Sequence, residues 1–237
     1  MKLRRRIAWA LGYDLLRIRR SSSAEALTRQ LITTVQPSLV FDVGGNEGQF
    51  AHDALTSPGQ HRVVSFEPLS QAHAMLEAGA KNNARWQIAP RCAIGDERGT
   101  SKINISSFSG ASSLRGMNDT NLKAAPDTAY CGEESVDVLR LDDIGRSYIK
   151  PEDRIYLKVD TQGYEKNVID GASGILSQVV ALQIEVAFVE LYNGETLAFD
   201  IIPEILAQGF SIFAFCNGFR EKSTGRLLQA DVFFIRA

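Results

Sequence analysis

The segment LVFDVGGNEG, residues 39–48, decides the fold of this chain of 237 residues. Its first five residues form an almost wholly apolar run, which is typical of a strand buried on both faces of a parallel sheet. The glycines that follow predict a tight turn into a helix over residues 49–55, with free N–H groups that favour an anionic group. This order of strand, glycine loop and helix indicates an α/β domain with a ligand at the end of its first strand.

Outward from this segment, short apolar runs alternate with helical patterns. Further strands are expected over residues 62–68, 86–93, 155–160, 179–187, 210–215 and 232–235, and helices over residues 70–80, 168–176 and 199–207. The alternation predicts a doubly wound α/β fold with a seven-stranded, mostly parallel sheet. Residues 217–229 show no helical pattern, so the last strand is expected to be antiparallel. Residues 101–107 and 136–141 predict an inserted β-hairpin region.

Charge divides the chain into two parts. Residues 1–20 carry seven basic side chains and one acidic one, so the remaining 217 residues hold a net −8 within the total of −2. A mildly acidic body argues against a nucleic-acid enzyme with a basic groove. We expect residues 1–38 to be a basic N-terminal helical segment and residues 39–237 to be the catalytic domain. The basic residues 1–20 either pack on the edge of the domain or contact an anionic membrane.

The compartment is predicted from what the chain contains. No apolar run reaches 18 residues, so no transmembrane helix is expected. The three cysteines, Cys92, Cys131 and Cys216, are scattered and show neither disulfide nor zinc spacing. These features favour a reducing, cytoplasmic location, with peripheral contact at the inner face of the membrane if residues 1–20 bind lipid.

Residues at the strand ends predict a nucleoside site. The expected cofactor-binding residues are Asp42, Gly44, Gly45, Asn46 and Gly48 in the loop, Glu67 at the end of the second strand and Ala93 at the end of the third. An acid placed like Glu67 accepts hydrogen bonds from ribose hydroxyls. Residues 39–60 hold no lysine or arginine for a phosphate, and the loop lacks the G-x-G-x-x-G spacing. A carboxylate, an amine and a sulfonium fit this loop better than a pyrophosphate, so the expected cofactor is S-adenosylmethionine.

Three carboxylates are the candidate catalytic residues. Asp160 ends the fourth strand, Glu165 begins the next helix and Glu185 lies in the apolar fifth strand. They would act as a general base or hold a divalent metal, Mg or Mn, with Asp160 and Glu185 as ligands. Glu165 also fits a purely structural role at a helix N-terminus. A buried carboxylate needs a partner, so Lys158 is expected to pair with Glu185.

Polar loops are expected to bind the acceptor. Ser112 and Ser113 lie in the long loop over residues 108–130, and Tyr192 and Asn193 lie in the turn over residues 191–195. Their hydroxyl and amide groups suit a sugar. The three histidines are expected to be structural rather than catalytic.

Four segments of the chain carry a resemblance to a known family: DVGGNEG (42–48), SFEP (65–68), LKVDTQGYE (157–165) and QIEV (183–186). They resemble the FkbM family of S-adenosylmethionine-dependent O-methyltransferases over residues 39–236. The resemblance implies a Rossmann-like class I methyltransferase fold and a catalytic Asp160. Gly45 stands where the family usually has alanine. The segments LYNGE (191–195) and TGRLLQ (224–229) resemble a branch that acts on sugar hydroxyls.

The expected function is therefore O-methylation of a hydroxyl in a glycan or glycolipid, as part of glycan biosynthesis. One alternative keeps the reaction and changes the acceptor to a polyketide or other secondary metabolite. A nicotinamide-dependent oxidoreductase is disfavoured by the loop spacing and by the lack of a Tyr-x-x-x-Lys pair. A non-catalytic nucleoside-binding module is disfavoured by the presence of Asp42, Glu67 and Asp160 together.

Overall fold

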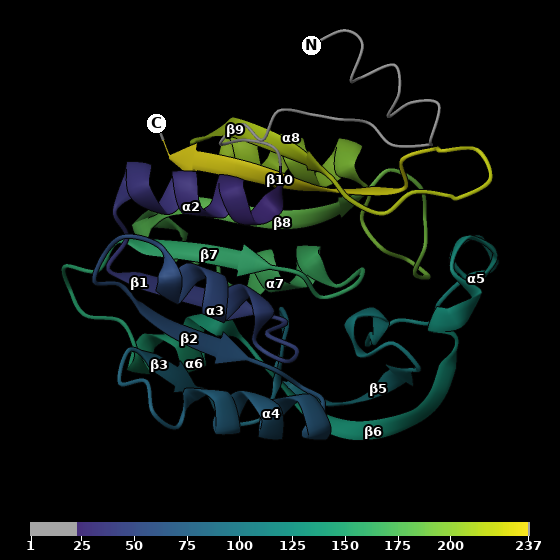
Figure 1. The fold of residues 1–237 in the computed structure, drawn as a ribbon, viewed down its shortest axis with the longest axis horizontal. Coiled ribbons are helices and arrows are strands. Elements are labelled where there is room, and N and C mark those ends of the chain that lie inside the picture. The colour runs from purple at the N-terminus through teal and green to yellow at the C-terminus, as the bar shows by residue number, and fades with distance from the viewer. Residues whose placement is uncertain (1–22, 237) are drawn as a thin grey trace, which may run out of the picture.

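The computed structural model describes residues 23–236 as an α/β domain built on two sheets (Figure 1). The main sheet has seven strands in the order β3 (Trp86–Ile88), β2 (Arg62–Phe66), β1 (Leu39–Val43), β7 (Ile155–Val159), β8 (Val179–Ala187), β10 (Gln229–Arg236) and β9 (Phe210–Asn217). The first five are parallel, and β10 runs antiparallel to both of its neighbours. The predicted doubly wound fold and its antiparallel last strand are confirmed.

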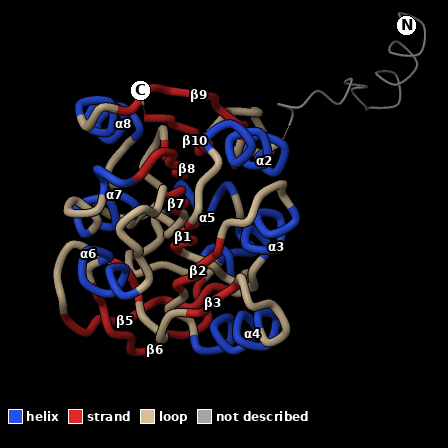
Figure 2. Tube along the Cα trace, turned by 90° about the vertical axis from the view of Figure 1, so that its left-hand side faces the viewer, coloured by secondary structure: helices blue, strands red, loops and turns tan. Residues whose placement is uncertain are grey.

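Helices cover both faces of this sheet (Figure 2). One face carries α2 (Ala24–Val35), α3 (Gln49–Thr56) and α4 (Ser70–Ala80), and the other carries α6 (Leu141–Ile144), α7 (Glu165–Gly171) and α8 (Ala198–Ala207). Each face buries its own apolar cluster, which explains why the parallel strands are apolar throughout.

A second, three-stranded sheet lies on the side toward which the parallel strands point (Figure 1). Its order is β4 (Ala93–Ile94), β6 (Tyr130–Leu139) and β5 (Gly99–Ser106), and β5 and β6 form the predicted inserted hairpin. Short helices fill the connections: η1 (Ser109–Ala111), α5 (Asp119–Ala124), η2 (Pro126–Thr128), η3 (Gly145–Ser147) and η4 (Leu176–Gln178).

The third strand is shorter than expected. It ends at Ile88, and Ala93–Ile94 leave the main sheet to pair with β6. Pro90 lies between them and has no N–H for a sheet ladder, so it separates the two pieces.

Helix α2 is part of the domain. Its buried residues Leu27, Leu31, Ile32 and Val35 recur at helical spacing and join the same cluster as Tyr156 of β7. Residues 24–35 of the expected N-terminal segment therefore pack on the sheet. The expected membrane contact falls on residues 1–20, which lie outside the described residues. Within residues 23–236, no helix is long and apolar enough to cross a membrane.

The register of the sheet aligns polar side chains in one row. Ser65 of β2 is paired with Asp42 of β1, Asp42 with Lys158 of β7, and Lys158 with Gln183 of β8. Side chains alternate between faces along a strand, so these four residues share the face covered by α2 and α3. A polar row inside an apolar layer marks the place where the site is built.

The packing of α2 generates a prediction about stability. Leu31 is fully buried, so Leu31→Ala should lower the free energy of unfolding by about 2–5 kcal/mol in urea titrations. Arg29, exposed on the same helix, is the matched control, and Arg29→Ala should change stability by less than about 0.5 kcal/mol. Equal, small effects of both substitutions would show that α2 is an appendage and that the core begins near residue 39.

Candidate active site

The loop after β1 is shaped by close backbone contacts. Gly44 has φ +78°, and a Cβ there would lie 1.8 Å from the carbonyl oxygen of Asp160. Gly48, with φ +95°, is the N-cap of α3, and a Cβ there would lie 2.6 Å from Trp86. Only glycine fits both positions. The loop therefore lies directly against the end of β7, which places its ligand beside Asp160.

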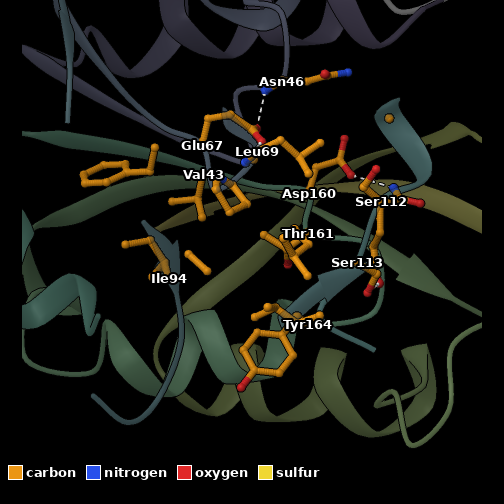
Figure 3. A pocket seen from close by; sticks show the side chains of 18 of the residues that line it. Val43, Asn46, Glu67, Leu69, Ile94, Ser112, Ser113, Asp160, Thr161 and Tyr164 are labelled. Atoms are coloured by element: carbon orange, nitrogen blue, oxygen red, sulfur yellow. Dashed lines mark hydrogen bonds between the residues drawn. The ribbon is translucent and has the colours of Figure 1, made fainter. Parts of the chain in front are cut away.

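Glu67 joins the loop to the end of β2. Its Oε2 accepts a hydrogen bond of 2.7 Å from the N–H of Asn46, and its Oε1 accepts one of 2.9 Å from the N–H of Leu69 (Figure 3). Burial raises the pKa of Glu67 to about 7, against the lowering effect of the two N–H donors. Each carboxylate oxygen has a second lone pair, so Glu67 can still accept from a ligand hydroxyl.

A pocket opens over these strand ends. It is lined by Gly44, Asn46, Glu67, Ala93 and Asp160, and across from them by Ser112 and Ser113 (Figure 3). The predicted cofactor-binding residues divide into two groups: Gly44, Asn46, Glu67 and Ala93 line the pocket, whereas Asp42, Gly45 and Gly48 do not.

Asp42 is instead the centre of a buried hydrogen-bonded row. Trp86 Nε1 donates to Ser65 Oγ at 3.0 Å, and Ser65 Oγ donates to Asp42 Oδ2 at 2.9 Å. Asp42 Oδ1 lies 3.3 Å from Lys158 Nζ. Asp42 is fully buried, so this lysine neutralises a charge that would otherwise be very costly.

Lys158 connects the row to the loop and to Asp160. Its Nζ donates to the carbonyl oxygen of Gly44 at 2.8 Å and lies 3.7 Å from Asp160 Oδ2. Burial opposes the charge on Lys158, but the carboxylates of Asp42 and Asp160 outweigh it and raise its pKa. The predicted pairing of Lys158 with Glu185 is therefore wrong: β7 places the lysine next to Asp42, and Glu185 has other partners.

The hydrogen-bond partners of Glu185 are two side-chain amides. Gln162 Nε2 donates to Asp160 Oδ1 and to Glu185 Oε2, both at 2.8 Å, and Gln229 Nε2 donates to Glu185 Oε2 at 3.1 Å. Burial and the charges of Asp160 and Asp231 raise the pKa of Glu185 well above its usual range. A neutral amide thus holds the two carboxyl groups at a fixed separation and supplies no positive charge to either.

Gln162 is itself held from two sides. Its Oε1 accepts from the Tyr192 hydroxyl at 2.7 Å, and its carbonyl oxygen accepts from Ser113 Oγ at 2.6 Å. Its backbone has φ +54°, which is uncommon for a residue other than glycine. This strained conformation and its four hydrogen bonds make Gln162 a rigid support for Asp160.

The other predicted acceptor-binding residues have different environments. Tyr192 is buried, and Asn193 is exposed and does not line the pocket. Ser112 Oγ accepts from the N–H of Ser106 at 3.0 Å while the residue lines the pocket. Of the four, only Ser112 and Ser113 line the pocket, and Ser113 is buried with its hydroxyl donating to the Gln162 carbonyl.

Glu165 braces the loop after β7. Its carboxylate accepts from the N–H groups of Thr161 and Gly163 at 2.8 and 3.0 Å, and it does not line the pocket. Burial raises the pKa of Glu165 to about 7. Its contacts match the structural alternative, an acid at the first turn of a helix that fixes the preceding backbone.

Two features of the site were not predicted from the sequence. The side chain of Gln162 carried no recognisable signal. Asp231 did carry a signal, because it directly precedes the apolar run 232–235, and Glu185 likewise lies in an apolar strand. The register pairs these two acids across β8 and β10. Burial and the charge of Asp160 raise the pKa of Asp231 to about 6.

The arrangement of the possible ligand side chains in the site does not fit a metal ion. In the part of the chain that the structure describes, no group of three or more His, Cys, Asp or Glu side chains could hold one. Asp160 and Glu185, the two predicted ligands, have the Gln162 amide between them. We therefore derive no step through a metal.

Comparisons with known proteins identify the family and the fold of the chain. The model of the methyltransferase FkbM domain matches residues 42–212. The 2-O-methyltransferase NoeI of Sinorhizobium fredii is 26% identical over 206 residues, which cover 81% of this chain and 83% of that protein. The crystal structure of an rRNA methylase from Streptococcus thermophilus aligns with a TM-score of 0.51 at 8% identity, covering 93% of this chain and 99% of that one. That likeness shows a shared fold.

The buried pair generates a prediction about stability. Lys158→Met leaves the Asp42 carboxylate buried without its cation, and should lower the free energy of unfolding by about 3–5 kcal/mol. Adding Asp42→Asn to this variant should recover part of the loss, because no uncompensated charge then remains. Urea titrations of the single and double variants measure both effects.

The control is Lys166→Met, which breaks ion pairs with Asp170 and Glu204 that are accessible to solvent. It should cost less than about 1 kcal/mol. Losses of similar size for Lys158→Met and Lys166→Met would contradict the central role of the buried pair.

Proposed function

The chain belongs to the FkbM family of S-adenosylmethionine-dependent methyltransferases, and we propose that it transfers the methyl group to a sugar hydroxyl of a glycan or glycolipid. The observation that carries this proposal is the position of Asp160. It lines the Glu67 pocket on one side and a second hollow, under α2, on the other. The amino-acid tail of the cofactor can reach this hollow across Gly44 and Asp160, which places the methyl group beside a carboxylate that can take a proton from an acceptor.

The residues of the pocket suit S-adenosylmethionine. Glu67 can accept from the ribose hydroxyls, and Ala93 and its neighbours give an apolar wall for the base. Asn46 lines the pocket, and its buried Oδ1 has no hydrogen-bond partner within the described residues. When bound, S-adenosylmethionine supplies an electrophilic methyl group on a sulfonium, and the acids nearby favour that positive charge.

Asp160 is the proposed general base. An alcohol is a weak nucleophile until its proton is removed. The acceptor O–H proton passes to the Asp160 carboxylate as the new O–CH₃ bond forms and the S–CH₃ bond breaks. Gln162 fixes Oδ1 of Asp160, which orients the carboxylate toward the acceptor and limits its motion. No histidine lines either hollow in the described residues, which leaves the carboxylates as the available bases.

One observation supports a hydroxyl oxygen as the acceptor atom, and a second supports a sugar. The relative NoeI is described as a 2-O-methyltransferase. The two segments that resemble the sugar-acting branch also lie together, because Leu191, Tyr192 and Leu228 belong to one apolar cluster. Through the Tyr192 hydroxyl this cluster supports Gln162, and Gln162 supports Asp160.

The role of Asp160 is tested by Asp160→Asn, which keeps the shape and removes the base. Turnover should fall by at least about 100-fold, with nearly unchanged affinity for S-adenosylmethionine in calorimetry. Asp170→Asn, a change of the same kind on the exposed side of α7, should leave turnover unchanged. An Asp160→Asn enzyme with the wild-type rate would remove Asp160 from the chemistry. Turnover of the wild type on polyketide hydroxyls, with none on a panel of glycans, would move the acceptor to secondary metabolites.

The role of Glu67 is tested by the pH dependence of nucleoside binding. Ribose hydroxyls donate to the ionised carboxylate, so binding favours the form that predominates above a pKa of about 7. The affinity for 5′-methylthioadenosine, which has the ribose and no titrating amine, should therefore rise about tenfold between pH 6 and pH 8. Glu67→Gln should weaken binding at pH 8 by about 1–3 kcal/mol and remove the pH dependence.

Glu47→Gln, at an exposed acid of the same loop, should keep the wild-type pH profile. A profile that is flat in the wild type, or that persists in Glu67→Gln, would show that Glu67 does not contact the nucleoside.

A further inference from the structure

An uncovered apolar surface lies at the edge of the main sheet, away from the Glu67 pocket. Six large apolar side chains are exposed among the described residues, and four of them are here: Phe199 and Leu206 on α8, and Ile212 and Phe215 on β9. Their exposed fractions lie between 39% and 76%. We call these four residues the α8–β9 surface. Single exposed apolar side chains need no explanation, whereas a group of them marks an interaction site.

The register of the sheet places Ile212 and Phe215 on the face that α8 covers. Ile212 is paired with Phe234 of β10, and Phe215 is paired with Val232. Residues that are paired in an antiparallel ladder point to the same face. Phe234 and Val232 belong to the apolar cluster that also contains the buried residues of α8. The two β9 side chains are nevertheless exposed, so α8 leaves this part of the last strand uncovered.

The exposed side chains of α8 point toward the same edge. Phe199 and Leu206 each follow a buried residue of the helix by one position, which is about 100° further around it. Glu204, one position before the buried Ile205, points the other way and pairs with Lys166 of α7. Because α7 and β9 lie on different sides of α8 (Figure 2), Phe199 and Leu206 face β9 and complete one surface with its exposed residues.

The charges around this surface favour a basic partner. Residues 198–217, which form α8 and β9, contain the acids Asp200 and Glu204 and no lysine, arginine or histidine. Glu204 is paired with Lys166, whereas Asp200 is exposed in the first turn of α8. Arg236 of β10 is already bound to three backbone carbonyl oxygens. A second copy of this surface would bring acid against acid, and an anionic membrane would be repelled by the same carboxylates.

Residues 1–22, which precede the described part of the chain, have the chemistry that this surface requires. Residues 1–20 carry seven basic side chains and one acidic one. Their apolar residues recur every three or four positions, at the spacing of one helix face: Leu3, Ile7, Leu11, Leu15 and Ile18. They also belong to the same chain, so their effective concentration at the surface is high.

The point at which these residues join the domain is close to β9. Ser23 is the N-cap of α2, and α2 contacts β8, β9 and β10. Glu25 lines the same hollow as Asp231, whose register partner on β9 is Cys216. Since β9 is the last strand, the chain has to pass over only one free edge to reach the other face. Twenty-two residues span up to about 70 Å when extended, and α8 is only about 15 Å long.

We propose that residues 1–22 dock on the α8–β9 surface, with their apolar side chains on Phe199, Leu206, Ile212 and Phe215 and an arginine beside Asp200. The chain thereby covers its own exposed sheet edge. This docking gives a definite place to the edge packing that the sequence offers as one alternative for the basic residues.

The first test places a photo-crosslinking residue on the surface of the full-length protein. Phe199 or Phe215 is replaced by p-benzoylphenylalanine, and the crosslinked peptides are identified by mass spectrometry. Both positions should crosslink to peptides of residues 1–22 of the same chain. The matched control is the same replacement at Met75, an exposed apolar residue of α4 (43% exposed), and should give no such crosslink.

The second test measures how fast trypsin cleaves after Arg17, Arg19 and Arg20. Docking shields these bonds, so the double change Phe199→Ser and Phe215→Ser should speed their cleavage at least about fivefold, in proportion to the undocked fraction. Asp200→Lys should also speed cleavage, because it removes a charge partner of the arginines. Met75→Ser should leave the rate unchanged. All of these positions are exposed, and unchanged urea midpoints would verify that the domain remains folded.

The outcomes are distinct. Crosslinks that join two chains would assign the surface to a second copy and overturn the proposal. Crosslinks to lipid with phosphatidylglycerol vesicles present, and none to residues 1–22 without them, would assign it to a membrane and overturn the proposal as well. Equal cleavage rates in the wild type and in the double variant would show that residues 1–22 do not dock here. None of these outcomes bears on the proposed methyl transfer.

Discussion

The buried charge of Asp42 is the constraint on which the site depends. A carboxylate with no exposed surface, in the middle of an apolar sheet, must be neutralised and hydrogen-bonded where it stands. Ser65 donates a hydrogen bond to it, and Lys158, its neighbour in the register, neutralises it from 3.3 Å, donates to the Gly44 carbonyl and lies 3.7 Å from Asp160. The same ammonium therefore fixes the ends of β1 and β7 relative to each other, and with them the loop that lies between the two hollows.

Beyond the Asp42–Lys158 pair, the described residues of the site include more acidic than basic side chains. Glu185 and Asp231 are direct neighbours across two strands, and both have raised pKa values because burial and the charge of Asp160 disfavour their ionised forms. A second lysine would have lowered these pKa values by supplying a positive charge. The side chains present are amides instead, Gln162, Gln183 and Gln229, which orient the carboxyl groups and supply no positive charge. Such a site stabilises a cationic donor and retains a base, and this is the combination that O-methylation by a sulfonium requires.

How much of the fold and of the candidate site could be predicted from the sequence depends on how far apart in the chain the interacting residues lie. The strands and the doubly wound fold came from apolar periodicity, a local signal, and the antiparallel end came from a connection without a helical pattern. The pocket position of Glu67 came from its place at a strand end. The partner of Lys158 depends on which residues share a register row, and the assignment to Glu185 failed for that reason. Gln162 gains its role from Tyr192, 30 residues further along the chain. The hollow under α2 includes a helix that precedes residue 39, where the family resemblance begins, so no motif pointed to it.

The central claim is that Asp160 stands beside the methyl group of a cofactor whose ribose is held by Glu67. A crystal structure of the protein with S-adenosylhomocysteine tests it most directly. The account predicts that the ribose hydroxyls lie within hydrogen-bond distance of the Glu67 carboxylate, and that the sulfur faces Asp160 with the amino-acid tail in the hollow under α2. S-adenosylhomocysteine with its ribose away from Glu67, or with its sulfur away from Asp160, would contradict it.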